Sequence, residues 1–141
     1  MNRRQAALKE MCEQFGIAIL YAFGSQAENV RQWVEGEMDR LPDGPADVDI
    51  GAKGIPGVRW SVRKKVDLAG AMEVLFGCSR VDLVFLQETD PFLAAEIIRG
   101  ERLFARDEYE ADEYDLYVLR RAGDFVPLEQ ERMAMILGES P

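Results

Sequence analysis

Apolar and polar residues alternate along the chain in a way that separates helices from strands. Apolar residues recur at four-residue steps between Arg3 and Phe15, the spacing of one helix face, and Gly16 ends this pattern. Residues 17–23 are apolar throughout and predict a buried strand that ends at Gly24. The chain is therefore expected to begin with a helix that leads into a central strand.

The same alternation continues downstream. Ser25 is followed three positions later by Glu28, a capping-box pattern that predicts the start of a second helix. Strand and helix patterns then follow in turn: a strand at 46–52, a helix at 62–76, a strand at 81–86, a helix at 92–99 and a short edge strand at 102–105. This order predicts an α/β (α+β) fold with a small mixed sheet flanked by helices.

The last third of the chain is polar and helical in pattern. Residues 108–137 predict helix with a break near 123–127, where Gly and Pro occur. With 141 residues, of which 48% are hydrophobic, the chain fits one core. We therefore expect residues 1–107 to form the core and residues 108–141 a C-terminal helical extension packed on the same domain.

The charge balance excludes some functions. The formal net charge of −9 argues against direct, sequence-independent binding of nucleic acid, which relies on Lys and Arg. The N-terminus lacks a signal-peptide pattern and no apolar stretch reaches membrane-spanning length, which predicts a cytoplasmic protein. The chain contains no histidine, which excludes Ser-His and Cys-His catalysis and histidine-bound zinc. Any chemistry must come from carboxylates, Lys, Arg, backbone amides or a bound hard metal.

Three aspartates interrupt strands that otherwise resemble core. Asp47 and Asp49 are two positions apart, so their side chains leave the same face of the predicted strand. Asp82 lies within the apolar strand 81–86 in the same way. Neighbouring carboxylates repel each other unless a cation lies between them, and Mg²⁺ prefers carboxylate and phosphate oxygens. The pattern indicates a shared Mg²⁺ site.

A candidate phosphate site precedes these aspartates. Gly24 and Ser25 stand between the predicted strand and the next helix. Free backbone amides at a helix N-terminus attract anions, and a glycine allows close approach of a phosphate to the backbone. Taken alone, such a junction is also an ordinary turn with a capping residue.

The order of these features resembles a known superfamily. Phe23-Gly24-Ser25, Asp47-Val48-Asp49 and Val81-Asp82-Leu83 resemble the motif set of the DNA polymerase beta-like nucleotidyltransferases, in particular its minimal, MNT-type branch. The segment 97–107 resembles the way that branch continues. The likeness covers the chain to about residue 107.

The resemblance implies a Mg²⁺-dependent enzyme that transfers AMP from ATP. In the MNT branch this enzyme is often the antitoxin that adenylylates a helical HEPN toxin encoded nearby. By this likeness Asp47 and Asp49 bind the metals and the triphosphate, and Asp82 completes the metal site and helps to deprotonate the acceptor hydroxyl. Gly24 and Ser25 hold the β and γ phosphates.

Two features depart from the family pattern. Gln26-Ala27-Glu28 stands where the branch carries basic residues, and Asp47 lies 22 positions after Ser25, a longer separation than usual. A basic cluster follows the second strand, and it is open whether it compensates at the nucleotide or is a solvated helix face. This basic cluster comprises Arg59, Arg63, Lys64 and Lys65.

Other functions stay open at this stage. A catalytically weak antitoxin could act by contact alone, and a small-molecule (aminoglycoside-type) adenylyltransferase would suit an acidic chain. An acidic run near the start of the C-terminal extension is either a solvated helix start or a docking surface for a basic partner. This run comprises Asp107, Glu108, Glu110, Asp112, Glu113 and Asp115. The sequence leaves the oligomeric state open, a homo-oligomer included.

Overall fold

The computed structural model describes residues 1–42 and 47–138. Within them the strands form a four-stranded sheet in the order β3-β2-β1-β4. The central strand β1 (Ile17–Phe23) is antiparallel to both β2 (Val48–Gly54) and β4 (Glu101–Ala105), whereas β3 (Val81–Phe85) is parallel to β2. The mixed sheet predicted from the sequence is confirmed.

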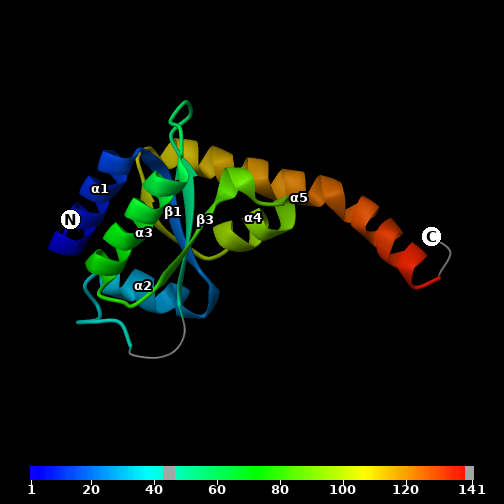
Figure 1. Ribbon diagram of the computed structural model, residues 1–141. Coiled ribbons are helices and arrows are strands. Elements are labelled where there is room, and N and C mark those ends of the chain that lie inside the picture. Colours follow the sequence, from blue (N-terminus) through cyan, green and yellow to red (C-terminus); the bar gives the residue numbers. More distant parts are fainter. Residues whose placement is uncertain (43–46, 139–141) are drawn as a thin grey trace.

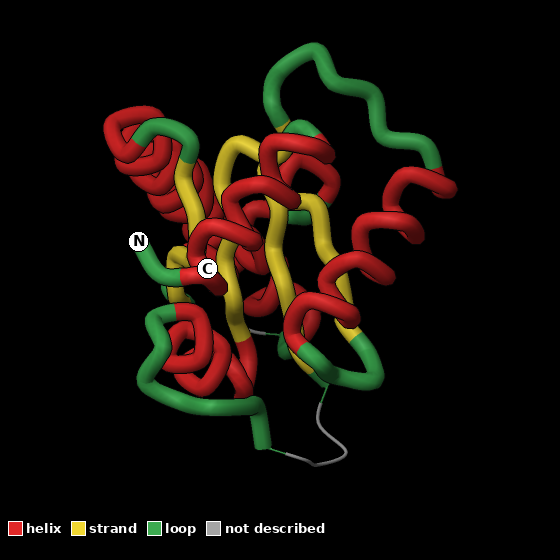
Figure 2. The backbone as a smooth tube through the Cα atoms, turned by 90° about the vertical axis from the view of Figure 1, so that its left-hand side faces the viewer, coloured by secondary structure: helices red, strands yellow, loops and turns green. Residues whose placement is uncertain are grey.

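Helices cover both faces of this sheet (Figures 1 and 2). Their bounds are α1 (Arg3–Phe15), α2 (Ala27–Val34), α3 (Val62–Phe76), α4 (Pro91–Ile98) and α5 (Glu108–Ile136), with two short 3₁₀ turns, η1 (Gly24–Gln26) and η2 (Leu86–Glu88). None of the described helices has the length and apolar composition needed to cross a membrane.

The hydrophobic core has two parts, one on each face. Residues of α1, α2 and α3 pack against one face of the sheet, and residues of α4 and α5 pack against the other. Strand β1 supplies side chains to both parts, which explains why its sequence is apolar throughout. Strand β2 supplies only its alternate residues, Val48, Ile50 and Ala52, to the part beneath α1–α3. Its other side chains therefore leave the face that α4 and α5 cover.

The second strand is displaced from its expected position. The sequence predicted 46–52, but β2 begins at Val48 and continues through Lys53 to Gly54 because both pair with β1. Residue 46 lies outside the described residues.

The capping box lies at a different helix from the one expected. Gly24 has φ 74° and starts η1, so α2 begins only at Ala27 and has no side-chain cap. Glu28 instead accepts from the Gln32 side chain at 3.4 Å. A true capping box opens α1, where Asn2 and Gln5 each bond the other's backbone N–H. The Ser25–Glu28 interpretation is wrong because the strand ends in a left-handed glycine that forces a tight turn first.

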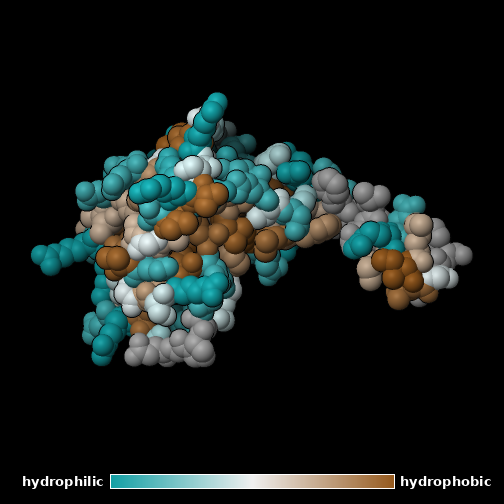
Figure 3. Space-filling view, in the orientation of Figure 1, coloured by the Kyte–Doolittle hydropathy of each residue, from teal (hydrophilic) through white to brown (hydrophobic). Residues whose placement is uncertain are grey.

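The C-terminal helix α5 is continuous through the region where a break was expected. Its first half packs on the sheet through Ala111, Val118 and Ala122, and its second half projects away from the body (Figure 1). Proline removes one backbone hydrogen bond from a helix, and along a solvated helix water can bind the carbonyl left free. Large apolar side chains are exposed near the projecting end (Figure 3), namely Met133, Met135, Ile136 and Leu137.

Candidate active site

The three sequence motifs meet at one end of the sheet. Asp49 lies directly opposite Asp82 in the parallel pair β2–β3, and Phe23 lies opposite Asp49 in the antiparallel pair β1–β2. Gly24, which follows Phe23, therefore comes against Asp49. A Cβ atom at Gly24 would lie 2.4 Å from the Asp49 Oδ2 atom. Strands β1, β2 and β3 thus bring one glycine and two carboxylates together.

The aspartates face the side of the sheet that α4 and α5 cover. Along β2 the side chain of Asp49 alternates with the core residues Val48 and Ile50. Gly51 shares the face of Asp49, and a Cβ atom there would lie 2.3 Å from the Ile97 side chain of α4. Asp47 precedes β2 at the same parity as Asp49. This places Asp47, Asp49 and Asp82 on one face at one end of the sheet.

The carboxylates at this end influence each other. Partial burial raises the pKa of Asp49, and the negative charges of Asp82 and Asp47 raise it further. Among the described residues Asp49 has no hydrogen-bond or ion-pair partner. A cation bound here would lower the repulsion, so the electrostatics favour a positively charged ligand.

Arg80 is a site residue that the sequence reasoning missed. Its Nε atom lies 3.2 Å from the Asp82 Oδ1 atom and 3.7 Å from the Asp47 Oδ2 atom. Val48 pairs with Val81, so the residue before each, Asp47 and Arg80, are neighbours at the start of the two strands. The i, i+2 spacing of Arg80 and Asp82 was the available signal, but only the strand register connects Arg80 with Asp47.

The donor set fits a hard divalent cation, although the carboxylates do not yet converge on one. Within the described part of the chain, no three acidic or cysteine side chains are arranged closely enough to hold a metal ion as they stand. Two of the three aspartates are turned to Arg80 instead. Three carboxylates with one guanidinium still leave a net negative charge, and carboxylate oxygens are the ligands that Mg²⁺ prefers. Asp47, Asp49 and Asp82 are therefore the residues that could hold such an ion.

The Gly24-Ser25 segment is an exposed 3₁₀ turn rather than the N-terminus of a helix. The left-handed φ of Gly24 and its contact with Asp49 both exclude a larger side chain at this position. An anion bound by this turn would therefore lie beside the Asp49 carboxylate. The turn and the aspartates can form one site.

The basic cluster does not reach this site. The Lys64 ammonium lies 4.3 Å from the centre of the Trp60 ring, and Lys65 pairs with Glu88 at 2.7 Å. Glu88 follows the C-terminal end of β3, whereas Asp82 lies near its start. The strand advances about 10 Å over the three residues from Asp82 to the end of β3. The Lys65–Glu88 pair and the aspartates are therefore at opposite ends of β3. Of the two interpretations left open by the sequence, the positions of Lys64 and Lys65 favour a helix face away from the aspartates.

The acidic run is largely paired within the chain. Arg102 of β4 binds Glu108, Asp112 and Asp115 at 2.7–3.0 Å, and Asp115 also accepts from the buried Tyr21 hydroxyl. Arg106 binds Glu110 at 2.6 Å. These contacts anchor the start of α5 to the sheet. Most of the run is therefore part of the fold rather than a free surface for a basic partner.

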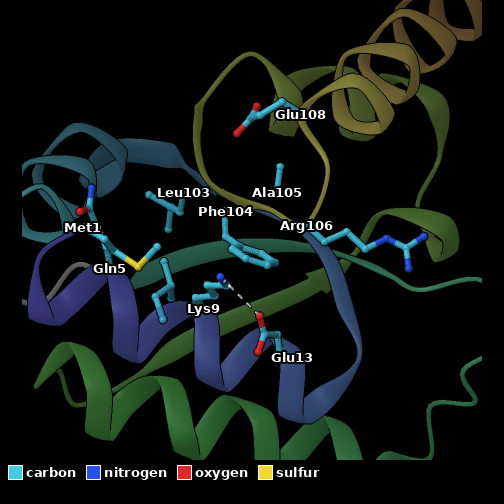
Figure 4. Close-up of a pocket in the computed structure, with 10 residues that line it drawn as sticks. Met1, Gln5, Lys9, Glu13, Leu103, Phe104, Ala105, Arg106 and Glu108 are labelled. Atoms are coloured by element: carbon cyan, nitrogen blue, oxygen red, sulfur yellow. Dashed lines mark ion pairs between the residues drawn. The ribbon is translucent and has the colours of Figure 1, made fainter.

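The two cavities described here are not lined by the predicted site residues. A cavity of about 550 Å³ lies between α1 and β4 (Figure 4). Its lining includes Lys9 and Glu13, which form an exposed ion pair at 3.9 Å, and the ring of Phe104. A cavity of about 280 Å³ lies between η2, α4 and α5 and includes Lys53, Tyr114 and Arg121. Neither cavity contains Gly24 or any of the three aspartates.

Comparison with solved structures places the fold. A chain assigned as a minimal nucleotidyltransferase superposes with a TM-score of 0.51 at 25% identity, over 70% of this chain and 86% of that one. A chain of a toxin–antitoxin complex with AMP-PNP superposes with a TM-score of 0.64 at 16% identity, over 94% of each chain. The chain has the fold of the minimal nucleotidyltransferases.

This minimal nucleotidyltransferase fold also occurs in a complex of MNT antitoxin with tri-AMPylated HEPN toxin from Shewanella oneidensis. That match has a TM-score of 0.62 at 15% identity and covers 94% of this chain and 92% of the other. No family model matches the sequence, and no curated protein matches it. The family resemblance predicted from the motifs is confirmed at the level of fold.

Proposed function

We propose that this chain is a Mg²⁺-dependent nucleotidyltransferase that transfers AMP from ATP to a hydroxyl group of a partner protein. The observation that carries the proposal is the meeting of Gly24, Asp49 and Asp82 at one exposed end of the sheet. Asp49 and Asp82 lie on two strands and Gly24 directly follows a third, and all three resemble motif positions of the nucleotidyltransferase superfamily. A purely structural role would leave unexplained why Asp49, which has no ion-pair partner among the described residues, lies opposite a second carboxylate.

Each site residue has a role in this proposal. Asp47, Asp49 and Asp82 hold the divalent cation, and the Gly24-Ser25 turn binds the outer phosphates through backbone amides and the Ser25 hydroxyl. Bound Mg²⁺ supplies positive charge that offsets the charge of the triphosphate and of the leaving pyrophosphate. Asp82 lies at the exposed side of the site and accepts the proton of the attacking hydroxyl.

The acceptor is a partner protein, and we propose a HEPN-type toxin for which this chain is the antitoxin. The two cavities described above do not include the aspartates, so neither of them supplies an acceptor pocket for a small molecule beside the carboxylates. A second chain that presents its hydroxyl at Asp82 would supply the geometry that in-line attack requires. The tri-AMPylated HEPN toxin in complex with an MNT antitoxin, which shares this fold, supports this choice of acceptor class.

A contact-only antitoxin is the second candidate. The basic cluster lies at the other end of the sheet, and Glu28 is exposed just after the Gly24-Ser25 turn. Both features weaken the binding of a triphosphate. Such a protein would bind and inhibit its partner without modifying it.

Intact-mass measurement of the partner separates these candidates. The chain is co-expressed with the product of its neighbouring gene, in parallel with the Asp47→Asn variant, and the partner is purified and weighed. Added mass of one or more AMP units with the wild-type chain alone supports transfer. An unmodified but inhibited partner in both samples supports inhibition by contact.

A further inference from the structure

We propose that Arg80 is an internal counter-ion that competes with divalent metal for Asp47 and Asp82. The inference rests on the proposed function, because it concerns the same carboxylates. It assigns to this chain a residue that sets how readily the site takes up its metal. Exchange of the Arg80 guanidinium for the metal ion becomes a step in loading the site.

The contacts of Arg80 define this role. One atom, Nε, lies 3.2 Å from Asp82 Oδ1 and 3.7 Å from Asp47 Oδ2, so the positive charge stands between the two carboxylates. The backbone holds Arg80 in place, since the Val48 N–H donates to the Arg80 carbonyl at 3.3 Å. Arg80 directly precedes β3 and is two positions from Asp82, so both side chains leave the chain on the same side. The guanidinium therefore occupies the region where a metal ion would share these two ligands.

The third carboxylate, that of Asp49, is not paired with the Arg80 guanidinium. Asp49 lies opposite Asp82 but has no ion-pair partner among the described residues. No three carboxylates of the described chain hold a common position while Asp47 and Asp82 are turned to Arg80. A metal ion that gathers all three must first separate the pairs with Arg80. Arg80 neutralises only one of the three negative charges, so a further cation is needed to neutralise the rest.

Exposure makes this exchange reversible. The Arg80 side chain is 68% exposed, so it can leave the carboxylates for solvent without loss of packing. Exposed ion pairs contribute little each, so Arg80 tunes metal affinity and does not block the site. Loss of its charge should leave three carboxylates that repel one another more strongly without metal and attract metal more strongly.

Titration with Mn²⁺ in the absence of nucleotide tests the proposal, with free Mn²⁺ followed by electron paramagnetic resonance. Arg80→Gln should lower the Mn²⁺ dissociation constant roughly three- to tenfold, since two exposed ion pairs no longer compete. Arg80→Lys keeps the charge and should lie nearer to the wild type. In EDTA, Arg80→Gln should melt at a lower temperature than the wild type and gain more from added Mn²⁺.

Arg106→Gln is the matched control. It also removes one positive charge and one ion pair, that with Glu110. Arg106 lies at the opposite end of β1 from the aspartates, where its backbone N–H donates to the Ala18 carbonyl. Its Mn²⁺ affinity should equal that of the wild type.

Two results would overturn the inference, and they differ in what they imply for the function. If Asp47→Asn abolishes Mn²⁺ binding while Arg80→Gln leaves the affinity unchanged or lowers it, Arg80 does not compete and the proposed metal site stands. If neither the wild type nor Arg80→Gln binds Mn²⁺, the metal site itself is wrong and the proposed function fails with it.

Discussion

The two ends of the parallel pair β2–β3 use charge in different ways. At the end where the strands begin, Asp49 faces Asp82 directly and has no ion-pair partner among the described residues. At the end where the strands finish, Lys65 binds Glu88 at 2.7 Å and also lies 5.1 Å from the centre of the Phe85 ring. The charges of Lys65 and Glu88 at the second end are paired within the fold, whereas at the first end Arg80 pairs with Asp47 and Asp82 and leaves Asp49 without a partner.

Aromatic packing strengthens this contrast. The rings of Trp60 and Phe85 are 4.6 Å apart, and Lys64 lies over the Trp60 ring. Such contacts stabilise the fold without needing a ligand. Like charges held together at the other end cost stability, and uncompensated charge in a folded protein is typical of functional sites. The comparison therefore supports the proposal that the function lies at the start of β2 and β3, and four predictions test it.

The largest expected effect is on catalysis at the acidic end. Asp49→Asn should reduce AMP transfer by at least about 100-fold, since it removes a charge on which the proposed metal site depends. Its melting temperature in EDTA should not fall, because the change relieves repulsion with Asp82. Intact-mass measurement of the partner and thermal denaturation check both parts. Asp67→Asn, on the exposed face of α3, is the control and should leave transfer unchanged. Normal transfer by Asp49→Asn would remove the basis of the comparison.

The next effect separates backbone strain from the geometry of the site. Gly24 and Gly57 both have positive φ, 74° and 88°, so an alanine at either should cost about 1–2 kcal/mol of stability. Only at Gly24 would the new Cβ meet Asp49, at 2.4 Å from Oδ2, whereas nothing lies within 4 Å at Gly57. Displacement of that carboxylate should lower transfer on the order of 10-fold or more.

Denaturant unfolding and transfer assays on Gly24→Ala and Gly57→Ala check this prediction. Similar losses of stability with a loss of transfer in Gly24→Ala alone would tie the glycine to the site. Equal transfer by the two variants would reduce Gly24 to an ordinary turn residue.

Strong hydrophobic patterns made part of this fold predictable. The predicted helix from Arg3 to Phe15 and the strands at 17–23 and 81–86 agree with α1, β1 and β3 to within one residue. Apolar spacing defines all three locally, and a glycine ends the first two. Strand parity also predicted that Asp47 and Asp49 share a face. These features depend only on neighbours in the sequence.

Features that depend on distant residues could not be predicted in the same way. The pairing of Asp49 with Asp82 requires the register of two strands more than 30 residues apart, and no local pattern specifies it. Arg80 was missed for the same reason, as its contact with Asp47 follows from that register. The place of the basic cluster stayed open for a similar reason, because its sequence position shows that it follows β2 but not at which end of the strands it lies.

The third prediction concerns pH and Tyr114, which lies near Lys53 at the C-terminal end of β2. Burial raises the pKa of Tyr114 to about 12, and the proximity of Tyr117 and Asp115 adds to the effect. The folded chain therefore keeps this phenol neutral at a pH where the unfolded chain, with a pKa of about 10, has lost its proton. The stability that Tyr114 contributes is complete below pH 10 and is lost as the pH rises from 10 through about 12.

Tyr114→Phe should accordingly flatten the loss of stability between about pH 10 and pH 12. Denaturant midpoints measured across this range, with Tyr109→Phe at a tyrosine that is 74% exposed as the control, check it. Parallel pH profiles for the wild type and Tyr114→Phe would show that the phenol titrates as if it were in water.

The smallest effect is expected from the basic cluster. This prediction tests whether charges at the C-terminal end of β2 and β3 matter for AMP transfer. Lys64→Gln and Lys65→Gln together remove two positive charges, which would be damaging if either contacted a triphosphate. Their partners are instead Trp60 and Glu88, beyond the C-terminal end of β3. At a separation near the screening length of physiological salt, the loss of both charges should change AMP transfer by less than about twofold. Stability should fall by about 1 kcal/mol or less, as expected for half-exposed ion pairs and cation–π contacts.

Transfer assays and melting curves beside Arg80→Gln check both expectations, because Arg80→Gln removes one positive charge at the acidic end. A loss of transfer of tenfold or more in the double lysine variant would mean that the nucleotide extends to the far end of β2 and β3.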